Sequence, residues 1–471
     1  MRLMATILTA AAITAGAAAH PGKVFATPEG MKFEVLSDST VSVGKLKDKN
    51  PGFSGVVTIP SGITAEGKSY TVTKVRSWGF FGCNGVTEFV IPSTITELDI
   101  WAFSCCEDLQ RIVIPESVTS IGYAALDGCK KLTDVTLPST LTTVPERMFQ
   151  NCEALTHITL PQSVKTIQNS AFSWCRALKE INLHEGITAI GNYAFSVCES
   201  LPNPKLPSTL RSLGRNAFSS CDSITSVILP EGLEKLGGEA FSGCVNLTHV
   251  RIPASLSDVG NSPFLTCLKL TSIDVAPESK LFSFRDGMLM DAEGTSIIQA
   301  LRTVVGGRVV IPSTVTTIGK LAFYDCNKIT ELVVPSSVKT MEFRSVHDCK
   351  RLTKVELNEG LKEMEGEVFN GCRELRQVYV PSSVERMGER VFGWCTALES
   401  VSLPEQLTTD QMTFNNMTFD QNDTVDIIVR KADGTTQTLH RSDLFDVKTL
   451  YRFTHDRLPP PQEPNAPRVL E

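Results

Sequence analysis

The amino-acid sequence predicts a β-rich repeat solenoid, a rod of stacked coils that each use 23 residues. Three residue columns recur at this interval: a cysteine, a phenylalanine three residues before it, and a proline nine residues after it. A fixed period of this length indicates a repeat architecture, because one coil buries its apolar side chains only by packing against its neighbours. The thirteen cysteines of the ladder are Cys83, Cys106, Cys129, Cys152, Cys175, Cys198, Cys221, Cys244, Cys267, Cys326, Cys349, Cys372 and Cys395.

Each coil is expected to contain a short strand that ends at the proline. Leu247, Val250 and Ile252 precede Pro253 in a short apolar alternation, and such alternation is typical of a strand. Proline lacks a backbone N–H donor, so the strand ends there.

A second strand and a turn complete the coil. Ile187 and Ile190 precede Gly191, and we interpret this second alternation as a short strand that closes on a glycine turn. The segment from Ala194 to Cys198 has helical spacing but is too short for a helix, so we expect a single helical turn there.

The cysteine and phenylalanine columns are expected to form the core ladder. Fourteen cysteines in an exported protein ordinarily suggest disulfides. Parallel stacking, however, leaves successive Cβ atoms about 4.8 Å apart, beyond the ~3.8 Å that a disulfide prefers. We therefore favour buried thiols that act as small hydrophobes, and expect Cys105, which lies off the ladder, to be the reactive or paired thiol. The predicted core ladder includes Cys106, Cys129, Cys152, Cys175, Cys198, Cys221, Cys244, Phe103, Phe172, Phe195, Phe218 and Phe241.

The repeat unit resembles a known family. The run from Ile190 through Ala194, Phe195 and Cys198 to Pro207 is similar to the BspA-like leucine-rich repeat of bacterial surface proteins, and the resemblance covers about residues 30–404. It implies a solenoid of the leucine-rich-repeat type and a secreted or surface-attached protein, in some members an adhesin for extracellular-matrix or plasma proteins. It implies no catalytic residues.

One repeat carries an insertion. The interval from Cys267 to Cys326 is two periods plus 13. The insertion contains Asp286 and Gly287 and resembles a hairpin that is common in the family, so a β-hairpin is expected near 277–306.

The first residues look like a signal peptide. Arg2 precedes an apolar stretch from Leu3 to Ala15, and small residues then offer a cleavage site after Ala19 or after Ala26. The stretch is shorter than the ~20 residues that cross a bilayer, so export is favoured over a membrane anchor. The expected parts of the chain are a signal peptide at 1–26, an N-terminal β cap at 27–68, the solenoid at 69–410, a C-terminal β cap at 411–458, and an extended proline-rich tail at 459–471.

The bulk composition and the motifs exclude several function classes. A net charge of -7 without a run of Lys and Arg argues against nucleic-acid binding. No later segment is apolar for long enough to span a membrane. Cysteines that are one full period apart line a core instead of converging on a metal, and no phosphate-binding or nucleophile motif is present. We therefore expect no cofactor, no metal and no enzymatic activity.

Function is expected on the outward side of the first strand. The residues two and four positions before each proline point away from the core and form two parallel columns along the stack. The candidate binding face contains Val90, Val113, Arg111, His157, Asn182, Lys205, Ile228, His249, Arg251, Val333, Glu356 and Tyr379. Apolar members of an exposed column favour contact with a partner. Trp78 and Trp101, one period apart, are favoured as packing residues over a ligand platform.

The function that fits these patterns is an adhesin, or a scaffold that binds an extracellular protein or glycan of the host matrix or a neighbouring cell. A passive structural spacer on the cell surface is the alternative. A glycan-acting enzyme is the third possibility.

Overall fold

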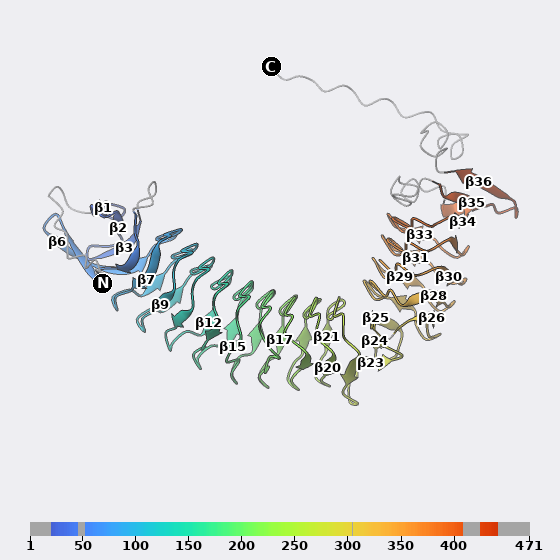
Figure 1. The fold of residues 1–471 in the computed structure, drawn as a ribbon, viewed down its shortest axis with the longest axis horizontal. Coiled ribbons are helices and arrows are strands. Elements are labelled where there is room, and N and C mark those ends of the chain that lie inside the picture. The colour runs from blue at the N-terminus through green and yellow to red at the C-terminus, as the bar shows by residue number, and fades with distance from the viewer. Residues whose placement is uncertain (1–19, 46–51, 304, 408–423, 441–471) are drawn as a thin grey trace, which may run out of the picture. The chain divides into compact units, whose positions relative to one another are not determined.

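The computed structural model describes residues 20–45, 52–303, 305–407 and 424–440. Most of the predicted signal peptide, the predicted tail at 459–471 and much of the predicted cap at 411–458 lie outside these residues. The chain divides into two compact units, Met1–Glu293 and Gly294–Glu471, and each unit is built of successive coils (Figure 1).

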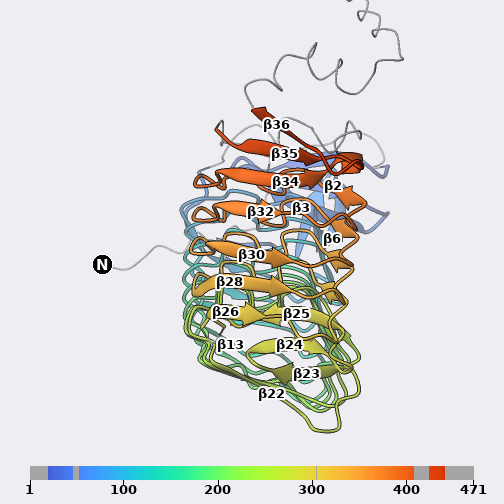
Figure 2. The ribbon, with the colours of Figure 1, turned by 90° about the vertical axis from the view of Figure 1, so that its right-hand side faces the viewer.

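Strand pairing confirms the solenoid and its period. Strands of successive coils are parallel and pair at an offset of one period, so that Arg111 pairs with Asp134 and Thr143 with Thr166. Each unit therefore carries two rows of short strands. In the second unit, Figure 2 shows strands of one row lying one above another in chain order.

The first strand row consists of the strands that precede the proline column. In the first unit these are β4 (Gly55–Thr58), β7 (Val86–Val90), β9 (Arg111–Val113), β11 (Asp134–Thr136), β13 (His157–Ile158), β15 (Glu180–Ile181), β18 (Ser226–Ile228), β20 (His249–Ile252) and β22 (Ser272–Val275). In the second unit they are β26 (Gly307–Val310), β28 (Ile329–Val334), β30 (Lys354–Leu357), β32 (Gln377–Tyr379) and β34 (Ser400–Pro404).

The second strand row follows the proline column. In the first unit it contains β6 (Lys68–Val75), β8 (Glu97–Leu98), β10 (Ser120–Ile121), β12 (Thr143–Val144), β14 (Thr166–Ile167), β16 (Ala189–Ile190), β17 (Ser212–Leu213), β19 (Lys235–Leu236) and β21 (Asp258–Val259). In the second unit it contains β25 (Ser296–Ala300), β27 (Thr317–Ile318), β29 (Thr340–Met341), β31 (Glu363–Met364) and β33 (Arg386–Met387).

Antiparallel strands lie before, within and after the repeats. The N-terminal ones are β1 (Val24–Ala26), β2 (Met31–Val35), β3 (Thr40–Lys45) and β5 (Gly62–Ala65). The insertion forms a hairpin of β23 (Phe282–Arg285) and β24 (Met288–Asp291) around Asp286 and Gly287. A second hairpin, β35 (Asp426–Arg430) and β36 (Thr436–His440), pairs with β34 and follows the short 3-10 helix η1 (Glu405–Leu407). Within the described ranges, no helix is long and apolar enough to cross a bilayer.

Stacked phenylalanine rings run through the interior. Phe172 and Phe195 are fully buried, with ring centroids 5.3 Å apart and planes within 4° of parallel. Phe195 and Phe218 repeat this contact at 5.0 Å. The fixed period places identical side chains in the same position of each layer, so the column becomes a continuous stack.

The expected helical turn between the second strand and the ladder cysteine is wrong. In each repeat, residues at this place have a left-handed backbone, for example Ser170 with φ 55° and Trp174 with φ 66°. The amides of Ser170, Phe172 and Trp174 donate to backbone carbonyls of the next coil. The amides between them donate to carbonyls of the same turn. The segment is thus a double turn tied to its neighbour, and we call it the loop edge.

The first strand row is interrupted in one coil. No strand of the first row is assigned in the coil between β15 and β18, where Pro202 and Pro204 remove two backbone donors. In the first unit the row divides into separate sheets on either side of this coil, and it divides again between β11 and β13.

Candidate functional site

Strand register places the predicted outward residues side by side. Arg111 of β9 lies opposite Asp134, and Val113 lies opposite Thr136. In the second unit Val333 lies opposite Glu356, and Tyr379 lies opposite Ser402. Within each continuous sheet of the first strand row, the residues of the two predicted columns therefore lie opposite their equivalents in the next coil.

Several outward side chains of this row are apolar and exposed. Ile228 is 66% exposed and Tyr379 is 52% exposed, and Val90 and Val113 are exposed on neighbouring coils. Val333 is half-buried. Val310, which was not among the predicted residues, is also exposed and pairs with Val333. The row thus presents aliphatic surface that the core does not use.

Two arginines of the row are paired with acidic neighbours. Arg111 Nε lies 3.1 Å from an oxygen of Asp134, and Arg251 Nη2 lies 3.9 Å from Glu231. Such exposed pairs contribute little to stability, about 0–1 kcal/mol each. They fix the positions of charge on an open surface.

Two further polar contacts hold side chains of the candidate face. His249 Nε2 is 3.6 Å from Asp274, and its Nδ1 lies 3.0 Å from Ser272 Oγ. Glu356 accepts a hydrogen bond from Lys354 at 2.5 Å. This bond and the charge of Lys354 hold the pKa of Glu356 below its usual value, so Glu356 presents a carboxylate at neutral pH.

Asn182, Lys205 and His157 of the predicted face differ from one another in exposure and hydrogen bonding. The Asn182 amide is half-buried, donates to the Leu160 carbonyl at 3.0 Å and accepts from the Leu160 amide at 2.6 Å. It replaces strand pairing where β15 ends, so this side chain is committed to the fold. Lys205 is exposed in the interrupted coil. His157 is exposed, with Nδ1 3.1 Å from Thr156 Oγ1.

The ladder cysteines are buried free thiols that also make hydrogen bonds. The thirteen ladder thiols are buried, and Cys105 is half-buried. Cys198 Sγ donates to the carbonyl of Phe172 in the preceding coil at 3.2 Å, and Cys221 Sγ donates to the carbonyl of Phe195 at 3.1 Å. Burial raises the pKa of Cys244 to about 12, so the thiol keeps its proton. Treating these thiols only as small hydrophobes missed this bond.

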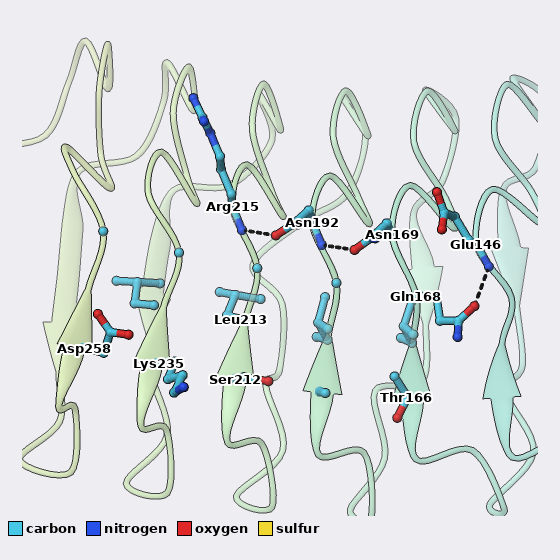
Figure 3. A pocket seen from close by; sticks show the side chains of 18 residues that line it. Glu146, Thr166, Gln168, Asn169, Asn192, Ser212, Leu213, Arg215, Lys235 and Asp258 are labelled. Carbon is cyan, nitrogen blue, oxygen red and sulfur yellow. Dashed lines mark hydrogen bonds between the residues drawn. The ribbon is translucent and has the colours of Figure 1, made fainter.

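A hollow of about 570 Å³ lies on the second strand row of the first unit (Figure 3). Its floor follows the glycine column that contains Gly191, Gly214, Gly237 and Gly260. A Cβ on Gly214 would lie 2.5 Å from the amide nitrogen of Asn192, so glycine permits close approach of the coils.

Asparagine side chains bridge the coils beside this hollow. Asn169 Oδ1 accepts from the Asn192 amide at 2.9 Å, and Asn192 Oδ1 accepts from the Arg215 amide at 2.8 Å, as Figure 3 shows. These oxygens satisfy backbone donors that the short strands leave unpaired. The hollow is therefore lined by groups with structural partners.

The loop edge carries all four tryptophans of the sequence. All four tryptophans, Trp78, Trp101, Trp174 and Trp394, have a positive φ between 52° and 66°. Trp78, Trp174 and Trp394 are exposed, and Trp101 is half-buried. Sequence reasoning identified the pair of Trp78 and Trp101 but favoured packing for it, and it did not place the other two on the same edge.

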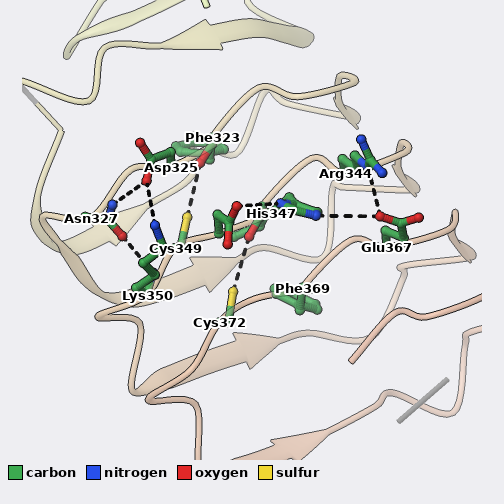
Figure 4. A network of polar contacts seen from close by, with 12 residues as sticks. Phe323, Asp325, Asn327, Arg344, His347, Cys349, Lys350, Glu367, Phe369 and Cys372 are labelled. Atoms are coloured by element: carbon green, nitrogen blue, oxygen red, sulfur yellow. Dashed lines mark hydrogen bonds and ion pairs between the residues drawn. The ribbon is translucent and has the colours of Figure 1, made fainter. Parts of the chain in front are cut away.

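A polar cluster joins three coils of the second unit (Figure 4). His347 lies between Asp348, 3.4 Å from Nδ1, and Glu367, 3.6 Å from Nε2, and stacks on Tyr324. Arg344 Nε donates to Glu367 at 2.8 Å. Burial lowers the pKa of His347 although the carboxylates act to raise it. These contacts connect charges on successive coils.

Over the described ranges, no group of three or more His, Cys, Asp and Glu side chains is arranged so that it could hold a metal ion. The surfaces described above are thus the two strand rows and the loop edge of a leucine-rich-repeat solenoid. Such a solenoid is a class of repeat scaffold.

Comparison with protein families identifies the class more closely. Residues 63–179, 165–287 and 307–424 match the BspA type leucine rich repeat region, described as 6 copies. These matches span most of the chain, and the protein belongs to the BspA-type leucine-rich-repeat family. The resemblance read from the sequence is confirmed.

Solved structures similar to this chain come from several bacteria. A leucine rich cell surface protein from Faecalibacterium prausnitzii A2-165 is 22% identical, with 88% of this chain and 96% of that chain covered and a TM-score of 0.48. A leucine-rich repeat protein from Bacteroides ovatus ATCC 8483 is 24% identical, with 85% and 98% covered and a TM-score of 0.44. The pneumococcal vaccine antigen PcpA is 17% identical, with 88% and 95% covered and a TM-score of 0.42. No curated protein sequence matches the chain.

Proposed function

We propose that this protein is exported and acts as an adhesin or binding scaffold. In this proposal the first strand row captures an extracellular protein or glycan of the host matrix or a neighbouring cell. Membership in a family of repeat scaffold proteins supports a binding role over an enzymatic one. The observation that carries the proposal is the exposed aliphatic and aromatic surface on this row.

At Ile228 that surface is not required by the fold, whereas the Tyr379 ring also contacts the Arg430 guanidinium at 3.9 Å. Val227 and Leu229 flank Ile228 on the chain and are buried to 1% exposure, whereas Ile228 itself projects from the coil. The same column accepts Lys205 and Arg251, so the strand does not need an apolar residue there. Covering exposed apolar surface is favourable by about 25 cal/mol per Å², and such surface favours contact with a partner protein.

The charges beside these residues support selectivity. Arg111 and Asp134 lie beside Val113 and Thr136, so positive, negative and apolar groups alternate over neighbouring coils. Alternating charge on an open surface discriminates between partners and accelerates encounter more than it adds affinity.

The test uses the full chain from residue 20 onward, purified and applied to immobilised extracellular-matrix and plasma proteins and to a glycan array. Replacing Ile228 or Tyr379 by Ser is expected to weaken capture of the bound component about tenfold, since covering one such side chain contributes roughly 1.5 kcal/mol. Lys235→Ala, an exposed change on the second strand row, is the matched control and should leave capture unchanged.

Charge reversal separates this function from a passive spacer. Arg251→Glu and Glu356→Arg should each weaken capture if the row is the binding face. A spacer would bind no component of either panel, and the variants would then be indistinguishable from the parent. A glycan-acting enzyme would instead release shortened products from array glycans, which chromatography of the supernatant detects.

Cleavage after Ala19 fits the proposal of export better than cleavage after Ala26. Strand β1 pairs antiparallel with β2, and Phe25 is buried against Tyr70 with ring centroids 5.9 Å apart. A cut after Ala26 would remove this strand from the N-terminal cap. We therefore propose that the exported chain begins at His20.

A further inference from the structure

The hollow on the second strand row extends along the stack of coils. Its lining comes from the successive strands β14, β16, β17, β19 and β21 and from the turns that follow them. Two outward side chains in its middle are small, because Ala189 and Ser212 stand where other coils carry Lys235, Glu363 or Arg386. The glycine column adds no side chain beside them. The hollow is therefore open along several coils.

Three side-chain amides line this hollow. Gln168 Oε1 accepts from the Glu146 amide at 2.9 Å, and the Oδ1 atoms of Asn169 and Asn192 accept backbone amides at 2.9 and 2.8 Å (Figure 3). Because each oxygen accepts from a backbone N–H, the remaining nitrogen of each amide carries two N–H donors. Within the described ranges, these nitrogens donate to no other protein group. We call Gln168, Asn169 and Asn192 the amide row.

The charged groups of the lining balance one another. Glu146 lies at one end of the hollow, and Lys235 and Asp258 lie on paired strands at the other end. The Arg215 guanidinium is held by Glu239 at 2.7 Å. A cleft attracts ions of one sign when its walls carry the other sign. The lining, with two acids and two bases, therefore favours a ligand without net charge.

The spacing of the coils favours a sugar chain over an extended peptide. Parallel strands lie about 4.8 Å apart, whereas an extended peptide advances about 3.3 Å per residue, so its carbonyls fall out of step with the coils. A pyranose unit of an extended glycan is about as long as one coil spacing. Its hydroxyl groups accept from amide N–H groups and also donate to hydroxyl oxygens such as those of Thr166 and Ser212.

We propose that the hollow binds a neutral glycan chain that lies along the stack, with successive sugars over successive coils. The amide row donates to the hydroxyl and ring oxygens of the sugars. Thr166 and Ser212, whose side chains also line the hollow, exchange hydrogen bonds with the sugar hydroxyls. This site lies on the second strand row and is independent of the function proposed for the first.

The test is affinity electrophoresis of the full chain from residue 20 in gels that contain hydroxyethylcellulose, laminarin, xyloglucan or soluble starch, with alginate as the polyanionic comparison. Retardation is expected in at least one of the four neutral gels. The proposal is overturned if no gel retards the parent chain, or if alginate alone does.

Filling the hollow should block the chain. Ser212→Arg places a long side chain in the middle of the hollow, and the fold accepts arginine at this column because Arg386 occupies it in another coil. The apparent affinity should fall at least tenfold. Ser120→Arg is the matched control, because Ser120 is exposed at the equivalent position of β10 and does not line the hollow. Equal retardation of the two variants would contradict the proposal.

Asn192→Asp tests the amide row itself. The variant keeps an oxygen that accepts from the Arg215 amide and loses both N–H donors, so binding should weaken about tenfold. Asn84→Asp is the matched control, because Asn84 Oδ1 accepts from the Glu107 amide at 3.2 Å outside the hollow. Its retardation should equal that of the parent. Binding by Asn192→Asp at the parent's affinity would exclude the amide row as the donor.

A first-row variant separates the two sites. Ile228→Ser should leave the retardation intact, because Ile228 projects from the first strand row. Loss of retardation in this variant would assign the glycan to the first strand row and overturn the present proposal. Failure of the first row to capture any matrix or plasma protein would leave the retardation unchanged.

Discussion

The thiol of Cys198 donates to the carbonyl oxygen of Phe172, 3.2 Å away in the preceding coil, and the same oxygen accepts the amide of Cys175 at 3.2 Å. One carbonyl thus joins two successive coils. The pattern recurs at Phe149, whose carbonyl accepts the Cys175 thiol at 3.1 Å and the Cys152 amide at 3.2 Å. The cysteine column therefore combines a small buried volume with a donor that reaches the next layer.

Removing one ladder thiol should destabilise the fold. We expect Cys198→Ala to lower the free energy of unfolding by about 1–2 kcal/mol, because it removes a buried hydrogen bond and leaves a small void. Urea unfolding followed by circular dichroism measures the change. Cys105→Ala, at the half-buried cysteine off the ladder, should shift stability by less than about 0.5 kcal/mol. Equal effects at the two positions would contradict the structural role of the ladder bond.

Thiol labelling should distinguish Cys105 from the ladder. A thiolate is the reactive species, and burial raises the pKa of ladder thiols such as Cys198 and Cys221 well above the ordinary value. The thirteen ladder thiols are also buried, whereas Cys105 is half-buried. A disulfide reagent at pH 8 should therefore modify Cys105 rapidly in the folded protein, and Cys105→Ala should abolish that phase. In denaturant all fourteen cysteines should react. Rapid modification of several ladder thiols in the folded state would be the opposite result.

Stability should fall in alkaline solution. The pKa of Cys244 is raised by burial to about 12 in the folded protein, whereas an unfolded cysteine titrates near 8.5. Above pH 8.5 the unfolded chain loses a proton that the folded chain keeps, so stability decreases by about 1.4 kcal/mol per pH unit for each such thiol. Urea midpoints measured between pH 7.5 and 10.5 should decline. The slope should be shallower in Cys244→Ala, and an unchanged slope would contradict this assignment.

The glycine column under the hollow should resist substitution. A Cβ on Gly214 would lie 2.5 Å from the Asn192 amide nitrogen and equally close to the Gly191 carbonyl carbon. Both atoms belong to the backbone, so relief requires the coils to separate. We expect Gly214→Ala to cost about 1–3 kcal/mol, measured by thermal or urea unfolding. Ser212→Ala on β17, the strand that Gly214 follows, is the control and should stay within about 0.5 kcal/mol of the parent.

The N-terminus of the exported chain should be His20. Expression in a bacterium with a secretory pathway, followed by intact-mass measurement of the exported product, reads the cleavage site directly. A product that begins at Thr27 would lack β1 and would contradict the role of the Phe25–Tyr70 contact in the cap. Phe25→Ala should lower stability by about 3 kcal/mol without moving the cleavage site.

The layers of the solenoid were predictable from the sequence because every regular coil uses the same period of 23 residues. When strands of successive coils pair in parallel, a constant spacing along the chain becomes a constant register in space, as in the pairing of His157 with Glu180. Identical side chains then meet, and the stack of Phe172 on Phe195 follows. The family resemblance rested on the same columns.

The loop edge was not predicted, because its backbone is held by bonds to the next coil and not by residue type. Trp174, Val197 and Ser220 all adopt the left-handed conformation immediately before a ladder cysteine. A signal was nevertheless present in the sequence. Gly128, Gly243 and Gly371 occupy this position in other coils with φ between 74° and 78°, and a recurring glycine at one position indicates positive φ.

The candidate binding columns were predicted by strand alternation, but the state of individual members was not. Asn182 belongs to an outward column, yet its amide bonds to both backbone groups of Leu160, because β15 ends one residue earlier at Ile181. Where a strand ends is decided by pairing with the neighbouring coil. The residue types in the column of Asn182 do not indicate where the strand ends.

The hydrogen bonds between coils have a consequence for the number of repeats that the protein can contain. Amides of the loop edge donate to the following coil, strands pair with the coils on either side, and ladder thiols donate to the preceding coil. Each of these bonds therefore connects adjacent repeats and skips none. Excising one whole period within the regular stretch would bring together donors and acceptors of the same kind as those removed. We therefore expect shortened or extended versions of this protein, differing by whole repeats, to fold with the terminal segments unaltered, which makes the length of the first strand row an adjustable property.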